Sequence, residues 1–421
     1  MNADRILWIY IFSLFLTSCS VNVEIPPSGN FDKDRLARVD AVIEKAIERG
    51  EISGAVALVQ KDGKVNYHKA FGYADIATQK EMTTDTIFRI ASMTKAVTSV
   101  GVMILYEQGH FGLNDPISDF LPEFADMQVI SEMAEDGTVA VTVPAESPIR
   151  VVDLLTHSSG ISYTFMQSKL KKTYQDAGVI DGLTDTNRVL ATQMKLLAQQ
   201  PLLFEPGSEF YYGLNTDLLG YFIEVVSGQA LDEFFAEHIT TPLKMSDTYF
   251  YLPDDKADRL ATLYAHVDGK GLVVSDGTES EIYLDNPNYP VEGARTYFSG
   301  GAGLSSTASD YGRLIQMLLN EGELDGARIL SRKSVELMRS ARVDWDNDGV
   351  ADMALGFSVV SDLGRYGELG SIGAYSWGGA FNTTYWIDPE EDLIAVFMSQ
   401  ARPVESDVSN RFETMVYQAL R

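Results

Sequence analysis

The sequence predicts an α/β protein in which a mostly helical lobe is inserted between two β-rich ends. Strand patterns occur near the N-terminus, at residues 54–60 and 65–72, and again near the C-terminus, at residues 381–387 and 393–398. From residue 113 to residue 289 the pattern is mainly one of short helices and loops. We therefore expect strands from both ends to share one antiparallel sheet that the terminal helices cover.

Apolar spacing and turn residues predict the individual elements. Residues 32–50 have helical spacing, and Asp62-Gly63 is a hairpin signal between the first two strands. A strand-like stretch at residues 87–90 precedes a long apolar helix over residues 93–108, which Gly109 closes. The remaining helices are expected over residues 150–156, 187–199, 215–227, 306–321, 331–340 and 406–420, and a further strand over residues 355–360.

The length of 421 residues exceeds what a single hydrophobic core usually organises. We expect a discontinuous α/β domain made of residues 34–84 and 296–421, and a mainly helical domain over residues 85–295. The net charge of −27 disfavours nucleic-acid partners, because an acidic surface repels phosphate. The single cysteine excludes an intramolecular disulfide and a cysteine-ligated structural zinc site.

The first residues have the pattern of an export signal. Residues 6–16 are almost wholly apolar, and the run is about half the length that crosses a bilayer. It ends in the sequence LTSC at residues 16–19, which resembles the lipobox of bacterial lipoproteins. This resemblance implies a signal peptide over residues 1–19, acylation of Cys19 and a tether over residues 20–33.

The same resemblance implies a location. A lipoprotein of this kind is held to a membrane of the bacterial cell envelope by its lipid and faces the periplasm. Ser20 favours the outer over the inner membrane, by resemblance to the lipoprotein sorting pattern. The alternative is an ordinary cleaved signal with an incidental cysteine.

Ser92 and Lys95 form a Ser-x-x-Lys pair at the start of the long apolar helix. Serine is a poor nucleophile until another group takes its proton. Residues three apart share a helix face, so the amine lies beside the hydroxyl, and desolvation lets such a lysine act as the base. A second pair, Ser168 and Lys171, lies in a polar stretch without an apolar face, so Ser92 is the preferred nucleophile.

Two further stretches suit the same chemistry. Tyr212 closes a loop before an amphipathic helix, and a phenol beside a lysine can relay a proton to a leaving group. The triplet Trp377-Gly378-Gly379 precedes Ala380 and a strand, and two glycines let a substrate lie against an edge strand. Taken alone, each has a plain structural explanation, since the chain has 20 tyrosines and glycines are common in turns.

Taken together and in this order, the three stretches resemble the serine β-lactamase and penicillin-binding-protein superfamily. The most similar branch is the class C-like esterases, called family VIII carboxylesterases. The resemblance runs from Arg35 to the C-terminus and includes the stretches at residues 149–160 and 299–311. It implies an α/β plus all-α fold of the class C β-lactamase and DD-peptidase type.

The resemblance also implies roles for single residues. Ser92 would be the acylated nucleophile, Lys95 its proton acceptor and Tyr212 a proton shuttle, and whether lysine or tyrosinate is the base stays open. The backbone N–H groups of Ser92 and Ala380 would form the oxyanion hole. Trp377, Gly378 and Gly379 would bind the substrate, and no cofactor is implied.

Two departures from the superfamily pattern bear on the substrate. The asparagine of the Tyr-x-Asn motif is missing, because Gly213 and Leu214 follow Tyr212 and Asn215 lies one residue late. The Lys-Thr-Gly triplet of β-lactamases and peptidases is replaced by Trp-Gly-Gly, and tryptophan cannot pair with a substrate carboxylate. The esterase branch shows this Trp-Gly-Gly pattern, so we expect a carboxylesterase that acts on small, neutral acyl esters.

Three alternatives stay open at this point. One is a β-lactamase or D-amino-acid peptidase on the same fold. Another is a catalytically inert cell-envelope binding protein, which the intact serine, lysine and tyrosine argue against. The third is transfer of the acyl group to an acceptor other than water. The sequence does not indicate the oligomeric state.

The histidines and the acidic stretch at residues 344–352 are the other candidates for a functional motif. None of the five histidines lies in a Gly-x-Ser-x-Gly elbow, and His157 fits a structural hydrogen-bonding residue near the site. Residues 344–352 resemble the start of a calcium loop, but position twelve is Leu355 where an EF-hand needs glutamate. We therefore interpret the stretch as an acidic surface turn and expect no metal. Its carboxylates are Asp344, Asp346, Asp348 and Asp352.

Overall fold

The computed structural model describes residues 31–277, 286–403 and 405–421. The predicted signal peptide, the lipidation site Cys19 and all but the last residues of the predicted tether lie outside the described residues. Within the described ranges, no helix combines the length and apolarity needed to span a membrane. The division into two domains at residues 84–85 and 295–296 stays a prediction.

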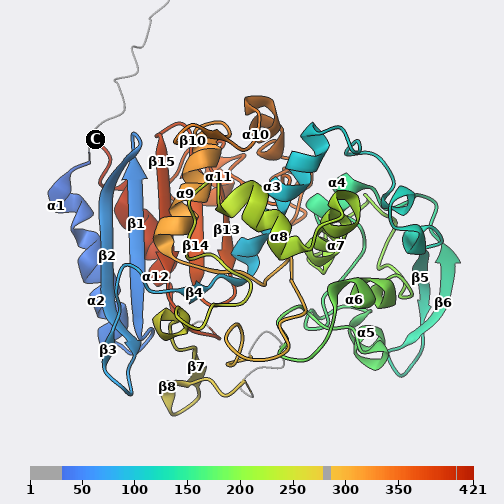
Figure 1. Cartoon of the computed structure of the whole chain (residues 1–421), viewed down its shortest axis with the longest axis horizontal. Coiled ribbons are helices and arrows are strands. Elements are labelled where there is room, and N and C mark those ends of the chain that lie inside the picture. Colours follow the sequence, from blue (N-terminus) through green and yellow to red (C-terminus); the bar gives the residue numbers. More distant parts are fainter. Residues whose placement is uncertain (1–30, 278–285, 404) are drawn as a thin grey trace, which may run out of the picture.

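A seven-stranded antiparallel sheet lies on one side of the molecule and most of the helices on the other (Figure 1). At its centre β1 (Gly54–Lys61) pairs with β15 (Leu393–Met398), so that the two ends of the chain meet in one sheet, as predicted. The strand order is β12, β13, β14, β15, β1, β2 and β3. The other strands are β2 (Lys64–Asp75), β3 (Lys80–Glu81), β12 (Ser358–Val359), β13 (Tyr375–Gly379) and β14 (Thr383–Asp388).

Different helices bury the two faces of the central strands. On one face Ala55, Ala57 and Val59 pack with α2 (Arg38–Glu48) and α12 (Val408–Tyr417). The alternate residues Val56 and Leu58 belong to the core on the other face, where α9 (Ala308–Leu319) contacts β1 and β15. Burial on both faces explains why β1 and β15 are apolar almost throughout instead of alternating with polar residues.

The second part of the molecule is built around α3 (Thr94–Glu107), which follows β4 (Phe88–Arg89). Every residue from Thr94 to Leu105 is buried, which explains why this helix is largely apolar on all sides, with Lys95 as its one charged residue in this range. β4 pairs with β9 (Ser305–Ser306), which lies just before α9, the helix that packs on the seven-stranded sheet. The surrounding helices are α4 (Val151–Leu155), α5 (Lys171–Ala177), α6 (Leu190–Leu197), α7 (Asn215–Ser227) and α8 (Leu231–Phe235), and α10 (Arg332–Met338) follows α9.

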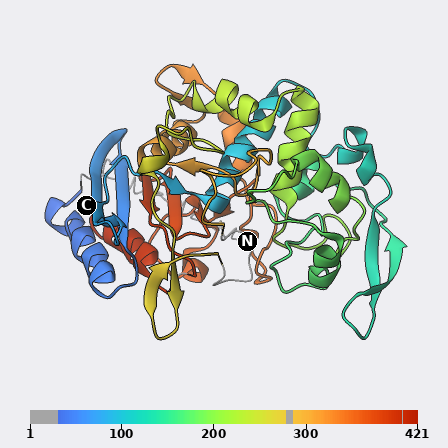
Figure 2. The ribbon, with the colours of Figure 1, turned by 60° about the horizontal axis from the view of Figure 1, so that its bottom comes forward.

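Two β-hairpins lie in the region that was predicted to hold mainly short helices and loops. They are β5 (Gln128–Met133) with β6 (Val139–Pro144), and β7 (Tyr264–Val267) with β8 (Gly271–Val274), and both project from the same side of the molecule in Figure 2. The prediction is wrong at these two places. β6 is largely exposed, so neither face imposes the buried alternation by which a strand is recognised in a sequence.

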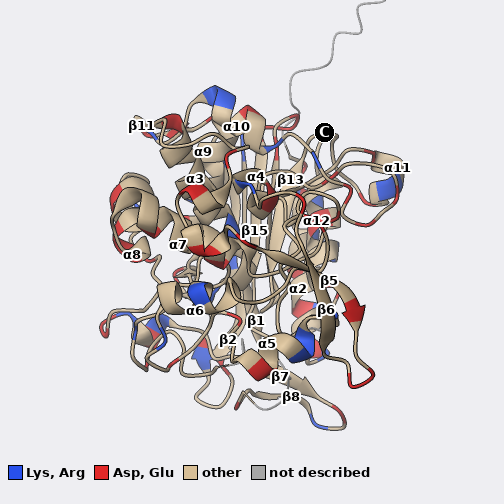
Figure 3. Cartoon of the chain, turned by 90° about the vertical axis from the view of Figure 1, so that its right-hand side faces the viewer, with Lys and Arg blue, Asp and Glu red and all other residues tan. Residues whose placement is uncertain are grey.

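Charged residues of both signs are interspersed over the helices and loops, whereas the strands at the centre of the molecule contain few of them (Figure 3). The net charge of −27 is therefore a property of the surface. It bears on solubility and on association with other charged molecules, and the fold does not depend on it.

Candidate active site

Ser92 lies in a short 3₁₀ turn, Ala91–Met93, directly before the first residue of α3. Ala91 is fully buried and has a φ of +41°, in the left-handed region that residues with a Cβ rarely adopt. Such a conformation persists only where the surrounding structure fixes it. Here the backbone N–H of Ile90 donates to the carbonyl oxygen of Leu304 at 3.1 Å, which holds the segment before the turn.

The side chains of Ser92, Lys95 and Tyr212 contact one another. Lys95 Nζ donates to Ser92 Oγ at 3.2 Å, and the Tyr212 hydroxyl donates to the same oxygen at 2.7 Å. Lys95 Nζ also lies 4.6 Å from the centroid of the Tyr212 ring. The fold thus supplies Ser92 Oγ with two neighbours that can take or return a proton.

Lys95 is almost completely buried, and two more acceptors hold its amine. Nζ donates to the carbonyl oxygen of Gly301 at 2.8 Å and to the hydroxyl of Tyr163 at 3.1 Å. Burial, followed by the negative charge of neighbouring groups, raises the pKa of Tyr163 well above its usual range, so this phenol stays protonated. Tyr163 was not predicted, because nothing in the sequence around it distinguishes it from the other tyrosines.

Asn215 does not join this group. Its amide contacts His157 Nδ1 at 3.0 Å and accepts a hydrogen bond from Ser159. The ring of His157 lies 4.8 Å from the ring of Tyr212, and burial, assisted by the charge of Lys95, lowers the pKa of His157 well below its usual value. His157 is therefore neutral and packs against the ring of Tyr212. This agrees with the structural role expected for it.

The triplet Trp377-Gly378-Gly379 precedes β14, as expected, and itself belongs to a strand that was not predicted, β13. β13 pairs with β14, with Trp377 opposite Tyr385 and Gly379 opposite Thr383. A Cβ atom on Gly379 would collide with the carbonyl oxygen of Ile90 and with the Thr383 hydroxyl. Glycine is thus required for the end of β13 to approach the segment that carries Ser92.

Ser92 lines a cavity of about 710 Å³ together with Tyr212, Trp377, Gly378 and Ala380. The backbones predicted for the oxyanion hole, Ser92 and Ala380, thus border one space, and Gly379 lies outside its lining. The rest of the wall is largely apolar and was not predicted. It includes Phe165, Met166, Phe210, Trp345 and Tyr366.

An aromatic wall runs along this cavity from Tyr212. The ring of Tyr212 lies 5.8 Å from Trp377, the ring of Trp377 lies 6.1 Å from Trp345, and that of Trp345 lies 6.0 Å from Phe210. Phe210 and Tyr212 come from the segment before α7, Trp377 comes from β13, and Trp345 comes from residues 344–352, called the acidic loop below. Such a surface suits apolar groups of a ligand.

Comparison with known proteins agrees with this geometry. Residues 39–419 match the family model described as Beta-lactamase. The chain belongs to the beta-lactamase family. An uncharacterized protein of Mycobacterium tuberculosis is 33% identical over 86% of this chain and 89% of its own length. Esterase EstB of Burkholderia gladioli is 29% identical over 86% of this chain and 90% of its own.

Among solved structures, EstCE1, described as a hydrolase with promiscuous acyltransferase activity, matches with a TM-score of 0.78 and 30% identity. The match covers 92% of this chain and 98% of EstCE1. The family and these relatives confirm the predicted β-lactamase-type fold and make this chain a serine hydrolase.

The acidic loop of this beta-lactamase-family chain has a role that the sequence did not reveal, since it carries Trp345 into the cavity wall. Ligand oxygens of Asp344, Asp346 and Asp348 lie within 4.8 Å of one another, and Asp352 is not part of this group. Asp348 pairs with Arg365 at 2.5 Å, and Leu355 at position twelve is fully buried. The expectation of no metal stays a prediction.

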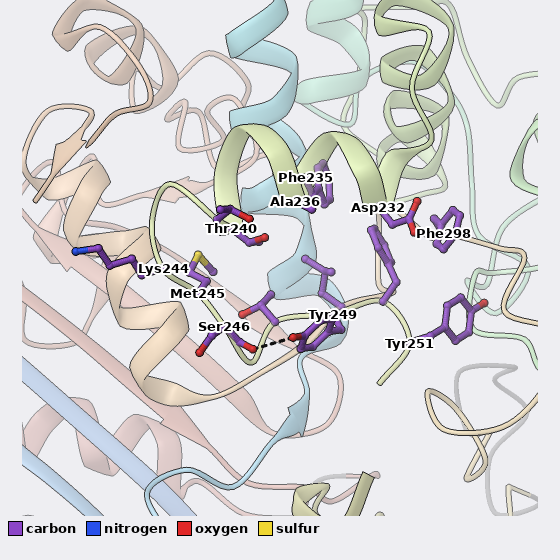
Figure 4. Close-up of a pocket in the computed structure, with 14 residues that line it drawn as sticks. Asp232, Phe235, Ala236, Thr240, Lys244, Met245, Ser246, Tyr249, Tyr251 and Phe298 are labelled. Atoms are coloured by element: carbon purple, nitrogen blue, oxygen red, sulfur yellow. Dashed lines mark hydrogen bonds between the residues drawn. The ribbon is translucent and has the colours of Figure 1, made fainter. Parts of the chain in front are cut away.

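Two other features lie apart from the Ser92 cluster. Ser168 Oγ shares a hydrogen bond of 2.9 Å with Ser162 Oγ, so the second Ser-x-x-Lys pair does not join the site. A second cavity, of about 430 Å³, lies between α8 and the segment from residue 244 to residue 251 (Figure 4). Its lining includes Asp232, Phe298 and Leu304, and none of Ser92, Lys95 and Tyr212.

Replacing Gly379 with alanine should slow the reaction of the protein with a fluorophosphonate about 100-fold, because a shift of about 1 Å in reacting groups costs this much. The new Cβ would push the end of β13 away from Ile90. The time course of the adduct by intact-mass spectrometry measures the rate.

Gly370→Ala is the matched control, because a Cβ at residue 370 meets its nearest neighbour, in the Tyr366 ring, at an ordinary 3.5 Å. This variant should react at the rate of the unmodified protein. Equal rates for the two variants would contradict the packing role of Gly379.

Proposed function

We propose that this chain is a carboxylesterase that forms an acyl-enzyme at Ser92 and transfers the acyl group to water. The observation that carries the proposal is the contact of Ser92 Oγ with both Lys95 Nζ and the Tyr212 hydroxyl on the wall of a substrate-sized cavity. A serine with two proton-transferring neighbours can attack a carbonyl. The aromatic wall then gives the acyl or alcohol part of an ester a place to bind.

In the proposed reaction Ser92 Oγ loses its proton to Lys95, directly or through Tyr212, and attacks the ester carbonyl carbon. The Oγ–carbon bond forms, and the carbonyl oxygen becomes an oxyanion that the backbone N–H groups of Ser92 and Ala380 stabilise. Tyr212 returns the proton to the departing alkoxide as the ester C–O bond breaks. Water then attacks the acyl-enzyme by the same route, which releases the acid and restores Ser92.

The wall of the cavity favours neutral substrates. Trp377 stands where lysine binds the carboxylate of β-lactams and peptides in the superfamily pattern, and its ring extends the aromatic wall. Arg402 also lines the cavity, so anionic substrates need a direct test beside esters.

A second candidate function is acyl transfer to an alcohol. The printed description of EstCE1 includes promiscuous acyltransferase activity. Hydrolysis and transfer share the acyl-enzyme and differ only in whether water or an alcohol attacks it. An apolar cavity wall favours an alcohol acceptor with an apolar body.

Ser92→Ala should abolish the fluorophosphonate adduct and the hydrolysis of p-nitrophenyl butyrate, because the bond to the probe forms at Ser92 Oγ. Ser168→Ala is the matched control, since it removes the serine of the other Ser-x-x-Lys pair, and it should retain both. Intact-mass spectrometry and release of p-nitrophenol are the measurements.

An equal adduct on wild type and Ser92→Ala would show that the nucleophile is another residue. Absence of an adduct on the wild-type protein would favour the inert binding protein. Nitrocefin and D-alanyl peptides are tested in parallel, and turnover of either above that of the ester would favour the β-lactamase or peptidase alternative.

Trp345→Ala should change the preference for acyl-chain length, because the indole forms part of the cavity wall. Removing it makes room for longer chains, so the ratio of kcat/KM for p-nitrophenyl decanoate to that for the butyrate should rise about tenfold. Leu369→Ala, a change at an exposed residue outside the lining, should leave the ratio unchanged. An unchanged ratio in Trp345→Ala would show that the acyl chain does not bind beside Trp345.

We further propose that Cys19 carries a lipid that holds the enzyme to a membrane of the cell envelope, with the active site in the periplasm. The lipobox-like sequence at residues 16–19 supports this. Labelled palmitate should enter the wild-type protein in a bacterial host but not Cys19→Ala, and only the wild type should sediment with membranes. A mature protein without label, beginning at another residue, would indicate an ordinary signal.

A further inference from the structure

Asp217 is a buried carboxyl near the site that the proposed mechanism does not use. It lies in the first turn of α7 and is fully buried. The Tyr297 hydroxyl is 3.5 Å from Oδ1, and Oδ2 has no hydrogen-bond partner among the described residues. Burial raises the pKa of Asp217 to about 6, against the opposing effects of Ser299 and Lys95. The group is therefore mainly a carboxylate above neutral pH.

Lys95 lacks a directly paired carboxylate. The groups that accept hydrogen bonds from Nζ, from Ser92, Tyr163 and Gly301, are uncharged, and none of the ion pairs found among the described residues includes Lys95. A buried ammonium without a compensating charge is costly. The charge of Lys95 favours the ionised form of Asp217, and the attraction between the two groups is mutual.

Gly301 lies between the two groups and sets how closely they approach. Its carbonyl oxygen accepts the hydrogen bond of Lys95 Nζ at 2.8 Å. A Cβ on Gly301 would collide with Asp217 Oδ2 and lie 3.1 Å from the Tyr163 hydroxyl. Gly300 likewise lies against the carbonyl oxygen of Thr216, at 2.5 Å from the position of a Cβ. Two adjacent glycines therefore bring the start of α7 to within one residue of the buried amine.

We propose that Asp217 is a positioning residue whose negative charge keeps a proton on the Lys95–Tyr212 pair and stabilises the Lys95 ammonium that forms as Ser92 loses its proton. The inference deepens the proposed function and rests on it. In general, a nearby negative charge favours the protonated form of a base, whether the base is an amine or a phenolate. The same charge lowers the energy of the ion pair formed in acylation.

The other titratable groups around the pair come from several segments. The tyrosines that face Asp217 are neutral, because burial raises the pKa of each, and His157 is neutral for the reason given above. Asp181 is the other carboxyl. It accepts from the backbone N–H of Thr164 at 2.7 Å, and burial raises its pKa to about 6. Among the described residues, the titratable groups in contact or in electrostatic interaction are His157, Tyr163 and Tyr212 for Lys95, and Tyr163, Asp181, Tyr289 and Tyr297 for Asp217.

The test is the pH profile of Asp217→Asn, which removes the charge and keeps the shape. The acidic limb of kcat/KM for p-nitrophenyl butyrate should move to lower pH by about one unit, with a lower plateau. Asp217→Ser should move the limb in the same direction, which covers the case in which the asparagine variant does not fold. Asp310→Asn is the matched control, because Asp310 is a buried carboxyl with a pKa of about 6 that contacts Asp247 and Thr248 instead. Its profile should match wild type.

If the acidic limb of the kcat/KM profile stays at the wild-type pH in both Asp217 variants, the proposal is overturned, even if the plateau falls. Asp217 would then have only a structural role. A limb that moves in Asp181→Asn but not in Asp217→Asn would overturn it as well, by assigning the charge to the other carboxyl. The pH dependence of fluorophosphonate labelling gives the same limb without an ester. If the acidic limb of labelling shifts in the Asp217 variants while the wild-type protein hydrolyses no ester, the role of Asp217 is retained and the proposed esterase activity is rejected.

Discussion

The buried amine of Lys95 is the constraint on which the arrangement of the site depends. Each hydrogen-bond donor removed from water must find an acceptor, or the folded state loses about 1–3 kcal/mol. The acceptors come from the turn before α3, from the segment with Tyr163 and from the stretch with Gly301. Satisfying one side chain thus fixes three separate segments relative to one another, and the nucleophile is held where they meet.

The sheet supplies the second fixed element. β13 is paired along its length with β14 and lies against the segment before Ser92, with glycine at the closest point. A paired strand moves less than a loop, so Trp377 is placed on a rigid strand beside a rigid helix end, and Ala380 follows directly after that strand. The aromatic wall then continues from this edge through Trp345 to Phe210. The residues around Ser92 and the aromatic residues that line the cavity therefore come from different parts of the fold, which meet at the end of β13.

Local patterns predicted much of this fold. The helix over residues 215–227 has the bounds expected for it, and β1, β2, β14, β15 and α3 lie within a few residues of their predicted places. All of them except β2 are largely buried, so burial imposed an apolar pattern on them, whereas the partly exposed β2 was recognised from the Asp62-Gly63 turn before it. The hairpin β5–β6 was missed because β6 is largely exposed, and the hairpin β7–β8 because strands of four residues are too short to show a clear period. β12 is shorter than predicted because only two of its residues pair with β13.

The sequence by itself determined the contact between Ser92 and Lys95, because three residues at the start of a helix bring the two side chains to one face whatever surrounds them. Only the tertiary structure explains the glycine at residue 379, where a Cβ atom would collide with the distant Ile90. Only the tertiary structure decided that Tyr163, Trp345 and Asp217 belong to the site. Tyr163 reaches Lys95 across 68 residues, and such partners are selected by the packing of whole segments, which leaves no local pattern in the chain.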